Sequence, residues 1–266
     1  MPLPPDYHLH TALCRHAIGE PSDYARRAIE LGLAEIGFAE HAPMPTDDFD
    51  DWHMRADQLD LYIEAVRKAQ KDFPELTVRL GLEMDYIPGI EDWLRELVAR
   101  ARWDYLIGSV HYLDEHWAID DPKQLALWEK HDVFEVWAEY FDRLTRAAGT
   151  GLFDIIGHAD LPKKFGFRPD RDCSQLYRRF LEAARKHNCA IEINTAGLRK
   201  DCRELYPGEQ FLRLACNAGV AIAFGSDAHK PEEVGLDFSM AVRAAKQAGY
   251  AHYSVFNLRN RQFQGL

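Results

Sequence analysis

Short apolar runs alternate with amphipathic segments along nearly the whole chain of 266 residues. The apolar runs predict strands, the first ending at His10 and the others over 35–40, 77–83, 105–110, 153–157, 190–193 and 221–226. Helical patterns lie between and after them, over 21–31, 57–73, 91–101, 132–148, 174–187, 207–218 and 231–248. Neighbouring parallel strands need crossover connections of this kind, so the alternation predicts an α/β protein with a parallel sheet.

About seven such units favour a closed or nearly closed TIM-like barrel. A doubly wound open sheet is the alternative, but it usually carries a glycine-rich phosphate loop after its first strand, where this chain has histidines. No linker or composition change divides the sequence, so residues 1–266 are expected to form one domain. The segment 114–130 is longer than the other connections, and its Trp117, Asp120, Asp121 and Trp128 indicate a folded loop.

Composition excludes several classes of protein. No apolar run approaches the roughly 20 residues that span a bilayer, and no signal-peptide pattern begins the chain, so a cytoplasmic protein without membrane contact is expected. The net charge of −11 argues against a nucleic-acid partner. Five scattered cysteines without a C-x-x-C pair predict reduced thiols. Cys14 lies among histidines and could be a ligand, although a small packed side chain is favoured.

A barrel makes a specific prediction, because its active-site groups come from the C-terminal ends of several strands. His8 and His10 are two residues apart and therefore leave one face of a strand. The residues at or just after the predicted strand ends are His8, His10, His16, Glu40, His41, Glu83, His111, His158, Asn194, Asp227 and His229. The remaining histidines, His53, His116, His131, His187 and His252, are expected in polar surface positions, with His53 or His116 the best candidates for a substrate pocket.

Imidazole and carboxylate groups together suit zinc, iron or manganese better than calcium or magnesium, which prefer oxygen ligands. The seven histidines at these strand ends, together with Glu83 and Asp227, give nine candidate ligands. This number exceeds the four that one tetrahedral zinc ion needs. The sequence therefore predicts a metal site at the C-terminal ends of the strands, with more than one ion.

The same residues carry a family resemblance. The motifs resemble those of the polymerase and histidinol phosphatase (PHP) superfamily: His8-Leu9-His10, His16, Glu40-His41, Glu83, Gly108-Ser109-Val110-His111, Gly157-His158-Ala159-Asp160 and Gly225-Ser226-Asp227-Ala228-His229. Further segments resemble the stand-alone histidinol-phosphate phosphatases: Tyr112-Leu113, Asp160-Leu161-Pro162-Lys163-Lys164-Phe165 and Asn194-Thr195-Ala196-Gly197-Leu198-Arg199.

The resemblance implies a distorted (β/α)7 barrel that holds three divalent metal ions, zinc, iron or manganese and possibly a mixture of them. It implies a first metal on His8, His10, Glu83 and Asp227, a second on Glu83, His111 and His158, and a third on His16, His41 and His229. Glu40, Asp160 and Asn194 are expected to orient ligands.

The activity implied is hydrolysis of a small-molecule phosphate monoester, L-histidinol phosphate, to L-histidinol and phosphate in histidine biosynthesis. Metal ions lower the pKa of bound water and clamp phosphoryl oxygens. The expected nucleophile is a metal-bridging hydroxide held by Glu83, His8, His10, Asp227, His111 and His158. Arg199 and Lys163 are expected to bind the phosphate, with Lys164 as a further candidate and surface charge as the alternative for both lysines.

Three other interpretations stay open from sequence. One is a PHP-type phosphoesterase that acts on nucleotides or other small phosphate esters. Another is an amidohydrolase-like metal hydrolase, although that family usually presents a bridging lysine where this chain has Glu83. The third is a metal-binding or regulatory domain without catalysis. The oligomeric state, the general acid and the groups that recognise the leaving alcohol are not readable from the sequence.

Overall fold

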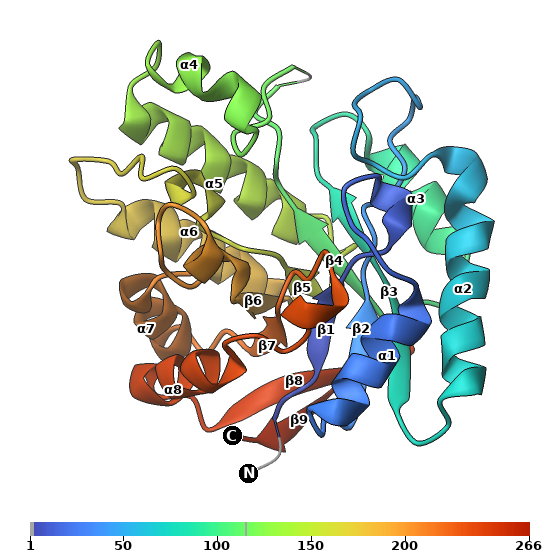
Figure 1. Ribbon diagram of the computed structural model, residues 1–266. Helices are drawn as coiled ribbons and strands as arrows, with labels where there is room; N and C mark the ends of the chain where they lie inside the picture. The colour runs from blue at the N-terminus through green and yellow to red at the C-terminus, as the bar shows by residue number, and fades with distance from the viewer. Residues whose placement is uncertain (1–2, 115) are drawn as a thin grey trace.

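The computed structural model describes residues 3–114 and 116–266. Its main sheet has seven parallel strands in sequential order. They are β1 Asp6–Leu9, β2 Glu35–Phe38, β3 Thr77–Asp85, β4 Tyr105–Ser109, β5 Ile155–Ile156, β6 Ala190–Asn194 and β7 Ile222–Gly225. The helices are α1 Pro21–Glu30, α2 Leu59–Asp72, α3 Glu91–Ala99, α4 Leu125–Trp128, α5 Val133–Gly149, α6 Ser174–Lys186, α7 Glu209–Asn217 and α8 Phe238–Ala248. Helices surround the strands in Figure 1.

The sheet closes on itself between its first and last strands. The backbone N–H of His10 donates to the carbonyl of Ala228 at 3.0 Å, and the N–H of Ala228 donates to the carbonyl of His8 at 3.1 Å. Because the strands are parallel, their C-terminal ends meet at one end of the barrel. The predicted distorted (β/α)7 barrel is confirmed.

A buried tyrosine fills the barrel below the polar end. The Tyr105 hydroxyl donates to the carbonyls of Tyr7 at 2.6 Å and Phe38 at 3.1 Å. A Cβ at Gly37 or Gly81 would lie only 2.3 or 2.4 Å from this side chain. These strands therefore need glycine where the ring crosses them.

The outer helices form where the sequence predicts amphipathic segments. Helix α5 begins after Asp132, whose carboxylate accepts hydrogen bonds from the backbone N–H groups of Phe134 and Glu135. Such a cap stabilises a helix by about 1 kcal/mol. The buried face of α5 packs toward the barrel with Val136, Trp137, Tyr140, Phe141 and Leu144.

Most predicted boundaries differ from the observed ones by one or two residues, and the largest difference is at the start of α8. Helix α8 begins at Phe238 and not at 231, because Gly235 and Asp237 adopt positive φ angles of 61° and 63° that interrupt a helix. Strand β5 is shorter than 153–157, although the Gly157 N–H still bonds the Gly108 carbonyl at 3.0 Å.

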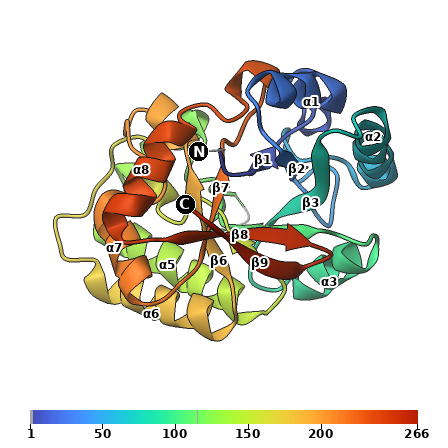
Figure 2. The same ribbon diagram turned by 90° about the horizontal axis from the view of Figure 1, so that it is seen from below.

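An antiparallel hairpin, β8 His252–Asn257 and β9 Asn260–Gly265, follows α8 and was not predicted. Figure 2 shows the hairpin across the end of the barrel where the strands begin. The Tyr7 hydroxyl accepts from the Phe256 N–H at 3.2 Å, and Arg259 pairs with Asp154 at 2.8 Å. The hairpin therefore covers the N-terminal end of the barrel and leaves the C-terminal end free for function.

The long segment after β4 is a folded loop, as predicted. Tyr112 and Ala118 form an antiparallel bridge, and a short 3-10 turn, Pro122–Gln124, leads into α4. Trp128 is buried, and its indole N–H donates to the Ile119 carbonyl at 3.0 Å. All five cysteines are free thiols, as expected. Within the described parts of the chain, no helix is both long and apolar enough to cross a membrane.

Candidate metal centre

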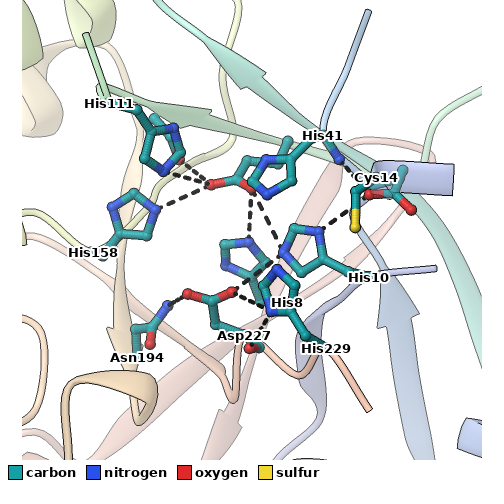
Figure 3. Close-up of polar contacts among 12 residues, drawn as sticks. His8, His10, Cys14, His41, His111, His158, Asn194, Asp227 and His229 are labelled. Atoms are coloured by element: carbon teal, nitrogen blue, oxygen red, sulfur yellow. Dashed lines mark hydrogen bonds and ion pairs between the residues drawn. The ribbon is translucent and has the colours of Figure 1, made fainter. Parts of the chain in front are cut away.

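The nine predicted ligands gather at the C-terminal end of the barrel. They come from β1 and the loop after it, from the ends of β2 to β5 and from the loop after β7, and they are His8, His10, His16, His41, Glu83, His111, His158, Asp227 and His229. Figure 3 shows His111 and His158 on one side of the group and His10, His41 and His229 on the other. Residues far apart in the sequence therefore share one small volume.

Glu83 lies at the centre of the group. Its Oε2 is 3.1 Å from His8 Nε2 and 2.9 Å from His41 Nδ1. Its Oε1 is 3.1 Å from His158 Nε2 and 3.9 Å from His111 Nε2. Each carboxylate oxygen thus faces a different set of imidazoles, which is the arrangement that a bridging ligand requires.

Two sets of possible ligand atoms match the predicted first and second metals. The atoms of His8, His10 and Asp227 lie within 4.8 Å of one another, and so do those of Glu83, His111 and His158. Either set can surround one ion with ligand atoms, and Glu83 lies between them.

The third predicted set is less compact. The His16 ring centroid is 4.5 Å from that of His229 and 5.4 Å from that of His41. The compact groups at this place are His10 with His41 and His229, and Cys14 with His16 and His229. Cys14 is buried, and its thiol donates to the Thr11 carbonyl at 3.1 Å. The assignment of His16, His41 and His229 to one ion stays a prediction.

The hydrogen bonding of the buried atoms shows that these residues are suited to metal ions. Several buried atoms of these residues make no hydrogen bond of good geometry, namely His8 Nε2, His10 Nε2, His41 Nδ1, Glu83 Oε2 and His229 Nε2. The first three nevertheless lie 3.1, 3.3 and 2.9 Å from carboxylate oxygens of Glu83 or Asp227. An unsatisfied buried polar group costs about 1–3 kcal/mol, so this many in one place need a compensating partner. A cation supplies one, and imidazole with carboxylate suits zinc, iron or manganese.

The electrostatics of the group also favour cations. Burial raises the pKa of Glu83, but His8 and His41 lower it by more than burial raises it, so the net pKa is well below its usual range. Burial lowers the pKa of His41 well below its usual value, and burial also lowers that of His229. Burial also lowers the pKa of His8, His10 and His111, but neighbouring carboxylates raise it more, to about 9 for His10 and about 10 for His111, so a metal ion that binds these imidazoles would release their protons.

Buried carboxylates orient three of the ligand histidines. Each accepts a hydrogen bond from Nδ1 and so directs Nε2 into the site: Glu192 from His8 at 2.6 Å, Glu40 from His10 at 3.3 Å and Asp85 from His111 at 2.9 Å. Glu40 lies beside the predicted ligand His10, as expected. Glu192 and Asp85 were missed, although a glutamate inside the apolar strand 190–193 was a usable signal.

Asn194 and Glu192 form a small network under the ligands. The Asn194 side-chain amide donates to Glu192 Oε2 at 3.0 Å and to Asp227 Oδ2 at 3.2 Å. This geometry agrees with the expectation that Asn194 orients a ligand. A Cβ at Gly225 would lie 2.0 Å from Glu192 Oε1, so this carboxylate reaches His8 only because residue 225 is glycine.

Asp160 and Lys163 lie elsewhere than expected. Lys163 is buried, and its Nζ donates to Asp160 Oδ2 and to the Leu205 carbonyl, both at 2.7 Å. Asp160 also accepts from the Gly208 N–H at 2.8 Å and bonds no metal-ligand side chain among the described residues. The two residues form a structural ion pair, which corrects the expectation that Asp160 orients a ligand and that Lys163 faces phosphate.

A cavity of about 710 Å³ opens over the metal ligands. The cationic side chains in its wall are Arg15, Lys123, Lys164, Arg199 and Lys200. Arg199 donates to the Ser226 carbonyl at 2.8 Å, while its Nη1 is buried without a partner. Lys164 therefore replaces Lys163 at the cavity, and Arg199 keeps a donor for an anion.

His53 is buried and not on the surface as expected. Its Nδ1 is 2.5 Å from Asp50 Oδ2, and its Nε2 is 2.9 Å from Asp85 Oδ2, the carboxylate that also holds His111. Burial lowers the pKa of His53, but the two carboxylates raise it more, so the net pKa is raised. His53 thus ties the loop that carries Trp52, a residue of the cavity wall, to the metal ligands. His116, His131 and His252 are exposed, and His187 is partly exposed.

A parallel barrel with buried imidazoles and carboxylates at its C-terminal end defines a class of metal-binding proteins. The PHP domain model matches residues 6–196 of the sequence. A Deinococcus radiodurans protein named probable histidinol-phosphatase is 41% identical over 245 residues, 92% of this chain and 93% of that protein. The chain belongs to the PHP domain family.

Two more distantly similar proteins also carry the name of a histidinol phosphate phosphatase. The histidinol-phosphatase of Bacillus subtilis is 29% identical over 260 residues, 88% of this chain and 96% of that protein. A histidinol phosphate phosphatase of Lactococcus lactis, solved in complex with zinc, L-histidinol and phosphate, has a TM-score of 0.85 at 22% identity, with 98% of this chain and all of that chain covered. The second comparison shows the fold.

Proposed function

We propose that this chain is a metal-dependent phosphomonoesterase that hydrolyses L-histidinol phosphate to L-histidinol and phosphate. The observation that carries the proposal is the cluster of buried imidazole and carboxylate groups under a cavity that also presents an arginine nitrogen without a hydrogen-bond partner. The relatives named histidinol-phosphatase support the choice of substrate. An enzyme of amino-acid biosynthesis is expected in the cytoplasm.

The ligand set would hold three divalent ions, zinc, iron or manganese. His8, His10, Glu83 and Asp227 would hold the first, and Glu83, His111 and His158 the second. His16, His41 and His229 would hold the third. Bound ions would supply charge neutralisation for the phosphate and a water of lowered pKa.

Residues of the chain itself would position the ligand histidines and contact the phosphate. Glu192 and Asp85 fix the rings of His8 and His111, so that each Nε2 faces the site. Arg199 Nη1 is available for a phosphoryl oxygen, and Glu233 lies 3.6 Å from Arg199 Nε and helps to hold the guanidinium. Lys164 adds a second cation in the wall. This arrangement positions a phosphate dianion against the ligand group.

A panel of phosphate monoesters tests the proposal. Metal-loaded protein should release phosphate from L-histidinol phosphate with the highest kcat/KM, ahead of nucleoside monophosphates and glycerol 2-phosphate. Equal or better hydrolysis of the nucleotides would favour the alternative PHP-type phosphoesterase and refute the proposed substrate.

A further inference from the structure

We propose that Asp120 is a specificity-determining residue that binds the positively charged part of the leaving alcohol. The cavity would then select phosphate esters of amino alcohols over those of neutral alcohols. The inference rests on the proposed phosphomonoesterase function and extends it to a site that neither the ligand set nor Arg199 explains.

The folded loop after β4 holds Asp120 beside the metal ligands. The Ile119 N–H donates to the carbonyl of His111 at 2.9 Å, and Trp128 anchors the Ile119 carbonyl from the other side at 3.0 Å. The Ala118 N–H donates to Gln124 Oε1 at 2.8 Å. The backbone that carries Asp120 is therefore pinned to a ligand histidine at one end and to α4 at the other.

Asp120 and Lys164 form an ion pair inside the cavity. Lys164 Nζ lies 2.9 Å from Asp120 Oδ2 and 2.7 Å from the Asp120 carbonyl, and the two side chains are 17% and 21% exposed. Asp120 Oδ1 receives no hydrogen bond from the described residues, so it can accept one from a bound molecule. Burial raises the pKa of Asp120, but Lys164 and His111 lower it more, to about 2.

The other carboxylates in the cavity wall have different positions. Asp51 is 77% exposed and pairs with Lys123 at 3.2 Å across the cavity mouth. Asp121 accepts from the Lys123 N–H at 2.8 Å and starts the 3-10 turn. Glu233 lies behind Arg199. Apart from the predicted ligands Glu83 and Asp227, Asp120 is thus the wall carboxylate that is mostly buried and that interacts electrostatically with His111.

The cavity wall also holds an aromatic side chain from the loop after β2. The ring centroid of Trp52 lies 5.2 Å from that of His111, and Trp52 lines the cavity. The Asp51–Lys123 pair joins the Trp52 loop to the Asp120 loop. A cation bound at Asp120 would gain a charge-assisted hydrogen bond, while the Trp52 ring itself stacks on His53 with the two centroids 3.9 Å apart.

The charges of the wall match a zwitterion. A phosphate dianion would lie against the metal ligands, Arg199 and Lys164, while an ammonium or imidazolium a few bonds away would reach Asp120. L-histidinol phosphate carries an ammonium and an imidazole, which is mostly protonated only below a pH of about 6.5, and glycerol 2-phosphate carries neither group. The ion pair of Lys164 and Asp120 therefore presents one partner to each end of such a substrate.

The test compares Asp120→Asn with the wild-type enzyme on L-histidinol phosphate, O-phosphoethanolamine and glycerol 2-phosphate. Asparagine keeps the size and an oxygen for Lys164 but loses the charge. We expect kcat/KM to fall about 10- to 100-fold for the two cationic esters and less than threefold for glycerol 2-phosphate. Asp114→Asn, an exposed position in the same loop, is the matched control and should change none of the three values.

An equal loss on all three esters would show that Asp120 acts only through Lys164 or the metal site, and would overturn the inference. No loss on the cationic esters would overturn it as well. Wild-type enzyme that hydrolyses phosphoethanolamine as well as L-histidinol phosphate would refute the proposed substrate alone, since Asp120 would still select for a cation.

Binding of L-histidinol, measured by calorimetry, gives a readout that does not depend on turnover. The Kd should rise about tenfold or more in Asp120→Asn and stay unchanged in Asp114→Asn. Unchanged affinity in Asp120→Asn would contradict the inference even if no ester proved to be a substrate.

Discussion

Glu192→Gln tests whether the carboxylate under β1 sets the metal site. The wild-type carboxylate accepts from His8 Nδ1 at 2.6 Å, from the His158 N–H at 3.0 Å and from the Asn194 amide at 3.0 Å. A glutamine has the same shape but only one acceptor oxygen, and its NH2 group would face a donor. At least one buried donor therefore loses its acceptor.

The expected magnitude follows from that geometry. Leaving a buried donor without an acceptor costs about 1–3 kcal/mol. Loss of a group that orients a ligand histidine lowers metal affinity about 10- to 100-fold. Because His8 would no longer be fixed with Nε2 toward the site, kcat/KM should fall together with metal affinity.

The assay is competition between the protein and a chelator for zinc, with phosphate release measured on the same samples. Glu182→Gln, an exposed position on α6, is the matched control and should behave as the wild type. Metal affinity within twofold of the wild type in Glu192→Gln would refute the orienting role of this residue.

Three further predictions concern the ligands, the phosphate contact and the buried His53. His8→Ala or Glu83→Ala should abolish turnover while circular dichroism shows a largely retained fold, and near-normal activity in either variant would show that the ligand assignment is wrong. Arg199→Ala should mainly raise KM for the phosphate ester, in steady-state kinetics, and an unchanged kcat/KM would remove Arg199 from the site. The raised pKa of His53 means that its contribution to stability is fully present below its ordinary pKa of about 6.5 and is lost as pH rises through the folded-state value. In urea unfolding of metal-free protein, the stability difference between the wild type and His53→Asn should therefore be largest near pH 6 and shrink at higher pH, and a difference that grows with pH would contradict this sign.

The sequence was sufficient for the barrel and for the gathering of the predicted ligands at one end of it. Alternating strands and helices place all strand ends together, and His8, Glu83 and Asp227 stand at or near such ends. Strand ends are defined by short-range pattern, so these residues can be located without knowledge of packing.

Side-chain direction in loops could not be predicted in the same way. Lys163 and Lys164 are neighbours in one short turn, yet one is buried against Asp160 and the other lines the cavity. His53 lies in a loop whose path depends on Asp50 and Asp85, which the sequence pattern does not connect. Only tertiary packing decides such cases.

The C-terminal hairpin was missed for a different reason. Its turn residues, Leu258 and Arg259, have φ angles of 49° and 64°, a conformation that asparagine and glycine usually supply. Without those residues the sequence gives no turn signal between β8 and β9. Contacts with Asp104 and Asp154 at the base of the barrel hold the turn in place.

If this chain is a histidinol-phosphate phosphatase with a cluster of three metal ions, its activity should depend on all three ions. The most direct measurement is the rate of phosphate release from L-histidinol phosphate as zinc or manganese is added stepwise to metal-stripped protein, with bound metal determined by elemental analysis. We expect little activity without metal and a rate that rises until three ions are bound per chain. Full activity with one ion per chain, or no release of phosphate from L-histidinol phosphate at any metal content, would contradict it.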